Sequence, residues 1–206
     1  VDDRLSLVNR TFTSAAIVTG FPQVWGALHP NATLVEDTDT LALTQGAHDL
    51  VVHAMGMHWA NDPVGQIIQS RRALQPDGLF LSVGFGGQTL HELRACLGQA
   101  EASITGGLSP RIAPMAELRD IGGLLQRAGL ALPVADSVTL TTEYSDIWHL
   151  MRDLRAMGEA NALTSRLRRP SGRAIFDAAG QLYRDHYATP EGRIKASFEL
   201  VFLAGW

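Results

Sequence analysis

Apolar, often β-branched runs alternate along this chain with segments whose apolar residues recur at helical spacing. The short runs predict strands, and the helical spacing predicts the helices between them. The predicted strands are residues 16–19, 33–36, 49–54, 79–84, 137–141 and 197–204. The predicted helices are residues 63–74, 89–100, 115–128, 147–157 and 173–187. Two helix ends carry signals of their own, because Asp62 precedes Pro63 as an N-cap and Gly129 follows the third helix as a C-cap.

This order of elements predicts an α/β fold. Strands that alternate with helices, some of them apolar throughout, indicate a mostly parallel sheet covered on both faces. The length of 206 residues suits one domain, so we expect a single doubly wound, Rossmann-like domain over residues 1–206 with about six strands. In such a sheet, ligands bind outside the C-terminal ends of the strands. The residues that follow predicted strands are therefore the first candidates for a functional site.

Composition narrows the possible partners and compartments. A hydrophobic fraction of 46% and a charged fraction of 18% are typical of a globular protein. The net charge of −4 does not favour a nucleic-acid partner, whose binding proteins carry a basic stripe. A single cysteine, Cys96, excludes an internal disulfide and fits a reducing compartment. No apolar run approaches the length that crosses a bilayer.

Five stretches, taken in order, carry a family resemblance. They are HDLVVHAMGMHWANDP (48–63), ALQPDGLFLSVGFGGQTLHELR (73–94), GGLSPRIAP (106–114), MRDLRAMGEANAL (151–163) and SFELVFLAGW (197–206). With them the chain resembles class I S-adenosylmethionine-dependent methyltransferases of the type-11 group. Within that group it is similar to the methyltransferase-like assembly factors of mitochondrial complex I and their bacterial relatives. LQPDGLF occurs in many methyltransferases, whereas GFGGQTLHELR together with LRAMGEANA is much more specific to the assembly factors.

The resemblance implies S-adenosylmethionine as the cofactor and residues that would hold it. Asp37 matches the acidic position that contacts adenine, Gly20 stands in the turn after the first strand, and the loop after the central strand lines the pocket in family members. The cofactor candidates are therefore Gly20, Asp37, Met57, His58 and Trp59. The alternative for the loop is a Trp packed on the sheet edge and Asp62 capping the next helix.

A second set of residues is a candidate for an acceptor or a protein partner. Gly86, Gly87 and Thr89 follow a predicted strand where backbone N–H groups open a helix, and Glu92 lies one turn further on as a ligand or a solvated residue. Asp153, Met157 and Asn161 recur at spacing four, which predicts one helical stripe. Gly158 within that helix suggests the close approach of a backbone or a ligand. Glu159 and Asn161 are then either acceptor ligands or surface residues.

The region after the first strand departs from the family. Gly20-Phe21-Pro22 replaces a glycine-rich loop, since Phe21 adds a ring and Pro22 removes an N–H; a plain strand-to-helix turn is the alternative. Val35 follows Val18 by 17 residues, which is enough for one crossover only. We therefore predict that the family's second strand and helix are missing, with their ribose carboxylate, for which Glu36 is a candidate substitute.

The missing strand and helix predict which strands are neighbours in the sheet. Residues 16–19 should lie directly beside residues 33–36, and the last strand should run antiparallel at or next to an edge.

Two other patterns bear on metal binding and on partner binding. His48, His53 and His58 recur every five residues, which suits no common metal-ligand spacing, so no metal site is predicted. Arginines concentrate at residues 166, 168, 169 and 173, as a solvated loop or as a docking patch for an acidic partner.

Two classes of function follow. One is a recognition or assembly module for a protein partner of the complex I type, with impaired cofactor binding. The other is an enzyme, either an active methyltransferase acting on a small molecule or protein, or a hydroxylase of a complex I subunit arginine. The specific motifs lie in the C-terminal two-thirds of the chain and the departures lie before them. This distribution favours the module.

Overall fold

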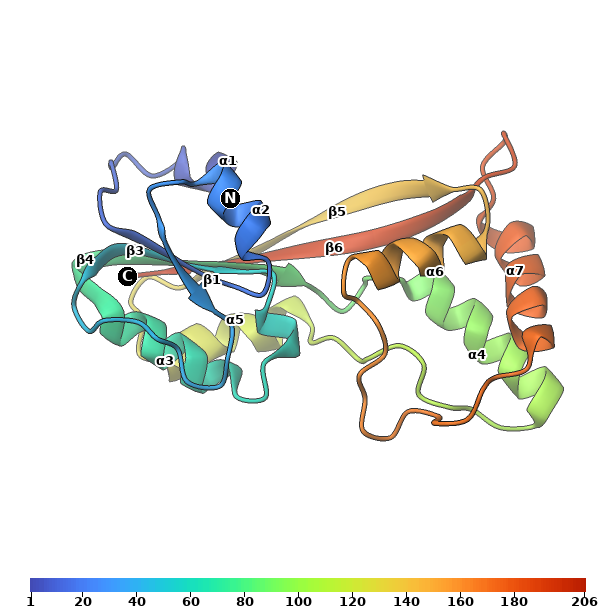
Figure 1. Ribbon diagram of the computed structural model, residues 1–206. Coiled ribbons are helices and arrows are strands. Elements are labelled where there is room, and N and C mark those ends of the chain that lie inside the picture. Colours follow the sequence, from blue (N-terminus) through green and yellow to red (C-terminus); the bar gives the residue numbers. More distant parts are fainter. The chain divides into compact units, whose positions relative to one another are not determined.

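The computed structural model describes all residues 1–206 and contains one six-stranded sheet in the order β2-β1-β3-β4-β6-β5 (Figure 1). Strands β1 to β4 are parallel, and β6 is antiparallel to β4. The strands are β1 (Ala15–Thr19), β2 (Thr33–Glu36), β3 (His48–Ala54), β4 (Leu74–Phe85), β5 (Val134–Tyr144) and β6 (Ile194–Gly205). The helices are α1 (Asp2–Leu5), α2 (Pro22–Leu28), the 3-10 helix η1 (Met57–Trp59), α3 (Pro63–Ala73), α4 (His91–Thr105), α5 (Leu118–Arg127), α6 (Ile147–Ala156) and α7 (Arg173–Tyr187). The predicted α/β fold with a mostly parallel six-stranded sheet is confirmed.

The shortened start of the sheet is also confirmed. Strand β2 pairs directly with β1, with Ala16 opposite Thr33 and Thr19 opposite Glu36, and only α2 connects the two. Strand β6 is antiparallel and lies next to the edge strand β5, as predicted.

Both faces of the parallel strands are covered because side chains alternate across the sheet. Val18, Val51 and Phe80 point to one face, where they pack in a core with residues of α3 and α5. Their neighbours Ile17 and Val52 point to the other face and join a second core with residues of α1 and α2. Figure 1 shows these two helix layers on opposite sides of the sheet. Each fully buried aliphatic side chain stabilises this arrangement by about 1.5–3 kcal/mol.

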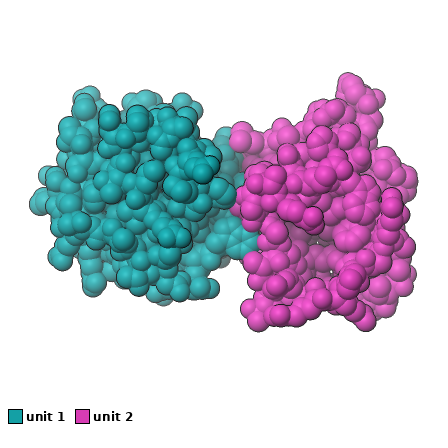
Figure 2. All heavy atoms as spheres, viewed as in Figure 1, with its two compact units in different colours: residues 1–87, 116–138, 200–206 teal, residues 88–115, 139–199 magenta.

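The chain divides into two compact units, coloured separately in Figure 2. The first unit comprises residues 1–87, 116–138 and 200–206 and contains both cores described above. The second unit comprises residues 88–115 and 139–199, in which α7 packs against α4 and α6. The expectation of a single domain over residues 1–206 stays a prediction. None of the helices is both long enough and apolar enough to span a bilayer.

Helix caps account for several boundaries. The Asp62 side chain accepts a hydrogen bond from the Gly65 N–H at 2.9 Å, as an N-cap does. Gly129 has φ +80°, and the N–H groups of Gly129 and Leu130 bond back to Gln126 and Leu125. This pattern is a Schellman C-cap, so both cap predictions are confirmed.

The sequence-based interpretation of Gly158 as a residue inside a helix is wrong. Helix α6 ends at Ala156, and Gly158 follows it with φ +82°. The N–H groups of Gly158 and Glu159 bond back to Arg155 and Leu154, which is again a Schellman C-cap. Glycine is favoured here because the left-handed backbone costs it nothing. The predicted helical stripe that ended at Asn161 is wrong for the same reason.

Candidate functional site

The cofactor candidates lie at the C-terminal edge of the parallel strands in the first unit. Gly20 follows β1, Asp37 follows β2, and η1 follows β3 after a two-residue connection. Parallel strands end at the same edge, so the topology brings these segments to the position where doubly wound folds bind ligands.

The turn after β1 is not a glycine-rich cradle. The Phe21 N–H already donates to Thr19 Oγ1 at 3.0 Å, and Pro22, the first residue of α2, has no N–H. The backbone N–H of Phe21 is therefore already used, and Pro22 has no N–H to offer a ligand. Gly20 itself is exposed, and a Cβ added there would meet no atom within 4 Å. The backbone here does not have to pass close to anything else in the chain.

Asp37 is directed into the protein rather than toward solvent. Its side chain is only 13% exposed, and its Oδ1 lies 3.6 Å from Nε2 of the fully buried His53. Its carboxylate also packs on Gly56, where an added Cβ would lie 2.7 Å from Asp37 Cγ and closer still to Oδ2. The predicted adenine contact therefore requires this carboxylate to serve two partners at once or to turn outward.

A buried polar network holds His53 and the segment after β2 together. His53 Nε2 lies 2.6 Å from Gln66 Oε1, and the Gln66 amide donates to the Thr38 carbonyl at 3.1 Å. Burial lowers the pKa of His53, while Asp37 and Gln66 act in the opposite direction. The imidazole is therefore neutral at neutral pH and donates from Nε2, which leaves its buried Nδ1 without a hydrogen-bond partner.

The three residues of η1 differ in what they present to solvent. Met57 is buried in the core beneath the sheet edge. The His58 ring packs edge-on against Phe85 at a centroid distance of 5.1 Å and covers Gly84, where an added Cβ would lie 3.3 Å from Nδ1. Trp59 lies beside His58 and is 38% exposed. Of the η1 residues, Trp59 offers the largest accessible surface to a ligand.

Glu36 is the acidic residue that the topology places beside the turn. It is the last residue of β2, exposed, and paired in register with Thr19. In doubly wound nucleotide-binding folds, an acidic residue on the strand beside the glycine turn contacts the ribose hydroxyls. The site therefore fits an adenosyl cofactor in part, because a carboxylate is present at this position whereas the glycine-rich loop is not.

The candidate residues around the start of α4 form internal bonds. Gly86 and Gly87 are buried directly after β4. In the second unit, Thr89 Oγ1 donates to the Glu199 carbonyl at 3.2 Å and accepts from the Glu199 N–H at 3.1 Å. Glu92 is 3% exposed and accepts from the Ser197 Oγ at 2.5 Å and the Ser197 N–H at 3.2 Å. Thr89 therefore fastens the segment before α4 to β6, Glu92 fastens α4 itself, and Glu92 is not a solvated helix residue.

Glu159 and Asn161 lie in the segment after α6. The half-buried Glu159 contributes its N–H to the α6 cap described above. The Asn161 amide donates to the Pro110 carbonyl at 2.8 Å, and its Oδ1 accepts from the Leu163 N–H at 3.1 Å. Asn161 therefore joins two loops of the second unit.

Sequence reasoning missed the strongest ion pair of the second unit. The buried Glu101 accepts from Arg111 Nε at 2.9 Å and Arg111 Nη2 at 2.6 Å, and also from the Ser109 N–H at 3.0 Å. Arg111 Nη1 donates to Ser171 Oγ at 2.9 Å. The partners come from a helix and two loops, so no periodicity could connect them. The only available signal was the GGLSPRIAP stretch, which contains Arg111 but not its partners.

The Glu101–Arg111 ion pair should make the stability of the fold depend on pH in acid. The Arg111 guanidinium, against the opposing effect of burial and with help from Ser109, lowers the pKa of Glu101 from 4.5 to about 2. The folded state then binds the Glu101 proton more weakly than the unfolded state does. The stabilisation is complete above about pH 4.5 and is lost as the pH falls toward 2, by roughly 3 kcal/mol in total. Urea unfolding between pH 7 and pH 3 should show a shallower loss of stability for Glu101→Gln than for the wild type. Parallel pH profiles would contradict the assignment.

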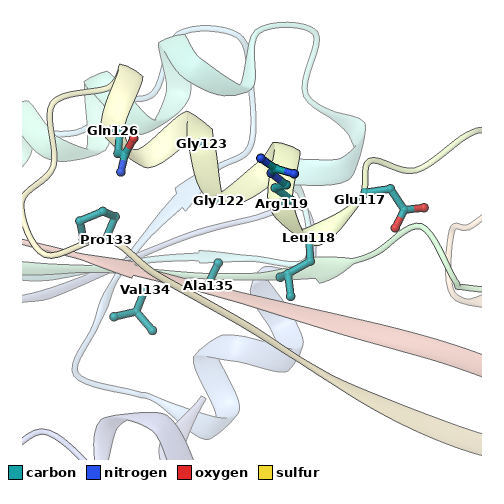
Figure 3. Close-up of a pocket in the computed structure, with 9 residues that line it drawn as sticks. All are labelled: Glu117, Leu118, Arg119, Gly122, Gly123, Gln126, Pro133, Val134 and Ala135. Atoms are coloured by element: carbon teal, nitrogen blue, oxygen red, sulfur yellow. The ribbon is translucent and has the colours of Figure 1, made fainter.

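A groove of about 770 Å³ opens in the first unit between α5 and the start of β5 (Figure 3). Gly122 of α5 faces Ala135 of β5 closely, since an added Cβ would lie 3.1 Å from the Ala135 Cβ. None of the residues singled out from the sequence lines this groove. No three His, Cys, Asp or Glu side chains gather closely enough to hold a metal ion.

The comparisons with known proteins concern sequence and fold. The chain is 36% identical to the mouse protein named arginine-hydroxylase NDUFAF5, mitochondrial, and 35% identical to its human counterpart, over 86% of this chain in both cases. It is 32% identical to a malonyl-[acyl-carrier protein] O-methyltransferase of Laribacter hongkongensis over 85% of this chain. The chain spans about half the length of these curated relatives, namely 51% of the NDUFAF5 proteins and 56% of the methyltransferase. No protein-family model matches the chain.

Solved structures agree on the fold. The YcgJ protein of Bacillus subtilis superposes with a TM-score of 0.58 at 12% identity, over 99% of this chain and 96% of that one. The Bacillus halodurans protein BH2331, which is named as a methyltransferase, gives a TM-score of 0.57 at 11% identity, over 98% of this chain and 96% of that one. The chain therefore has the class I S-adenosylmethionine-dependent methyltransferase fold, and it is a homologue of the NDUFAF5 proteins over about half of their length.

Proposed function

We propose that this chain is a recognition or assembly module that keeps a methyltransferase fold, binds S-adenosylmethionine weakly, and recognises a protein partner of the respiratory complex I type. The turn after β1 carries the proposal, because Phe21 and Pro22 leave no pair of free backbone donors beside Gly20. In this proposal the protein works in the bacterial cytoplasm or the mitochondrial matrix.

The position of Asp37 supports weak cofactor binding. Turning this carboxylate toward an adenine would remove it from His53 and Gly56, on which it packs. Charged hydrogen bonds contribute roughly 1.5–3 kcal/mol each, and a tenfold change in affinity corresponds to about 1.4 kcal/mol. Losing one such bond and the donors of the loop therefore costs several tenfold steps in affinity.

The relatives support the partner class. The NDUFAF5 proteins are named arginine-hydroxylases and are mitochondrial, which agrees with the resemblance of the sequence to complex I assembly factors. The match to them includes the stretches 73–94 and 151–163, which carry the specific motifs. For this chain, the complex I partner is a proposal that rests on that similarity.

An active enzyme is the second candidate, either a methyltransferase or an arginine hydroxylase. One observation favours it: Glu36 is exposed beside Thr19, at the place of a ribose-binding carboxylate. In that case Gly20, Glu36 and Trp59 would contact the cofactor, whose sulfonium would supply the methyl group in a transferase.

Calorimetric titration with S-adenosylmethionine and with S-adenosylhomocysteine separates the two candidates. We expect no binding, or a Kd weaker than roughly 100 μM, equivalent to less than about 5.5 kcal/mol. Binding at micromolar strength that is lost in Glu36→Ala or Asp37→Ala, but kept in the exposed control Asp39→Ala, would overturn the module and support the enzyme. Circular dichroism of each variant checks that it is folded.

A further inference from the structure

A small pocket of about 270 Å³ opens between α4 and the loop 106–114 in the second unit. Leu97 and Gly98 of α4 form one side, and Leu108 and Ile112 of the loop form the other. Leu108 is 72% exposed, so its side chain is accessible to a partner at the rim of the pocket. The pocket is large enough for one large side chain, and its volume lies just below the roughly 300–1,000 Å³ of small-molecule and cofactor pockets.

The wall of this pocket is fixed rather than mobile. Arg111 lines the pocket and is bound to Glu101 through two hydrogen bonds, and the Ser109 N–H binds the same carboxylate. The neighbouring Pro110 carbonyl accepts from Asn161. A preformed pocket does not pay the entropy of ordering its walls when a ligand enters.

The loop 161–171 carries positive charge to this wall. It is tied at one end through Asn161 to Pro110, and at the other through Ser171 to Arg111. Between these ties, Arg168 and Arg169 are exposed and make no hydrogen bond or ion pair within the chain. Arg169 precedes Ser171 by two residues, so its Cα lies within about 7 Å of the Ser171 Cα.

The charged side chains within this loop have one sign. The stretch 160–176 contains four arginines and no aspartate or glutamate. Arg166 donates to the Leu163 carbonyl, and Arg173 lies near Trp148 and Asp177. Arg168 and Arg169 are therefore the two guanidinium groups of the stretch that remain available to a partner.

We propose that the pocket and the loop 161–171 form one docking surface for an acidic protein segment. An apolar side chain of the partner enters between Leu97 and Leu108, and carboxylates beside it pair with Arg168 and Arg169. Guanidinium groups bind carboxylates with two parallel hydrogen bonds, which fixes the orientation of the segment. The combination of an apolar pocket with arginines fits a polypeptide that carries an apolar side chain between carboxylates, and the net charge of −4 does not favour a nucleic acid. This inference deepens the proposed recognition role and rests on it.

The test uses the full chain and a fluorescein-labelled peptide, Glu-Glu-Leu-Glu-Glu, followed by fluorescence anisotropy at 50 mM salt. We expect saturable binding that weakens at least fivefold at 300 mM salt, because the arginine contacts are exposed. Exchange of the central Leu for Gly should weaken binding at least fivefold, and Lys-Lys-Leu-Lys-Lys should not bind.

Variants test the two halves of the surface separately. The double variant Arg168→Ala/Arg169→Ala should weaken binding at least tenfold, whereas the matched loss of charge Arg119→Ala/Arg127→Ala in the first unit should change it less than twofold. Gly98→Leu should weaken binding at least fivefold by filling the pocket, since a Cβ at Gly98 meets Leu108 at an ordinary 3.8 Å. Leu108→Ser removes one wall without touching the helix and should have a similar effect.

Three results would overturn the proposal: no binding at millimolar peptide, equal binding by the arginine double variant and the wild type, or equal binding of the Leu and Gly peptides. The cofactor titration described above is independent of these measurements. Micromolar S-adenosylmethionine binding together with peptide binding would overturn the weak-cofactor module and leave the docking surface in place. Weak cofactor binding without peptide binding would overturn the docking surface and leave the weak-cofactor module in place.

Discussion

Arg111→Ala should cost the protein roughly 3–5 kcal/mol of unfolding free energy, because it leaves a buried carboxylate without its counter-charge. Glu101 is 4% exposed at its side chain, and Arg111 supplies two of its three hydrogen bonds. The same substitution also frees Ser171 and removes the guanidinium from the Phe176 ring, 5.6 Å away. Urea denaturation followed by circular dichroism at pH 7 measures the loss.

The controls separate this ion pair from a general effect of charge. Arg169→Ala removes an exposed arginine with no partner in the chain and should change stability by less than about 0.5 kcal/mol. Arg111→Lys keeps the charge but cannot bind the carboxylate through two parallel hydrogen bonds. Its loss of unfolding free energy should therefore lie between those of Arg111→Ala and Arg169→Ala. Equal stability of Arg111→Ala and Arg169→Ala would show that the buried pair is not a source of stability.

Gly56→Ala should destabilise the protein by about 1–3 kcal/mol, because its new methyl group overlaps the Asp37 carboxylate. The added Cβ would lie 2.7 Å from Asp37 Cγ and 3.1 Å from His53 Cε1. The φ of Gly56 is −118°, which alanine adopts freely, so the cost comes from crowding and not from the backbone. Thermal unfolding measures the change in stability.

A second glycine provides a matched control at the same sheet edge. Gly20→Ala adds a methyl group that meets no atom within 4 Å, and Gly20 has no positive φ. It should be neutral, or stabilising by up to about 1 kcal/mol, because alanine restricts the unfolded chain. If Gly20→Ala were the more harmful of the two, the described packing of Asp37 on Gly56 would be wrong.

Local signals were sufficient for most of the secondary structure. The strand at residues 33–36 and the helix at residues 173–187 have the predicted bounds, and Asp62 and Gly129 cap their helices as expected. Other bounds moved, as for β4, which begins at Leu74 rather than at residue 79. Alternation of side chains and cap residues depends on neighbours in the sequence, which is why these features could be predicted.

The shortened sheet could also be derived from the sequence, because it rests on chain length. The 17 steps from Val18 to Val35 allow one crossover and not two, so β2 was expected beside β1, where the structure has it. From this follows the position of Glu36 at the edge of the candidate site. The turn Gly20-Phe21-Pro22 was likewise recognisable as a departure from a glycine-rich loop, since Pro22 lacks an N–H whatever the fold.

The sequence by itself thus determined the fold class, the pairing of the first two strands and the composition of the turn after β1. Only the tertiary structure decided where side chains point: Asp37 into His53 and Gly56, Glu92 onto Ser197, and Glu101 onto Arg111. A candidate list drawn from strand ends could not separate residues that face solvent from residues that hold the fold together. The physical reason is that a buried polar group must find its partner wherever the chain brings one, and that partner is set by packing between distant segments rather than by any local pattern.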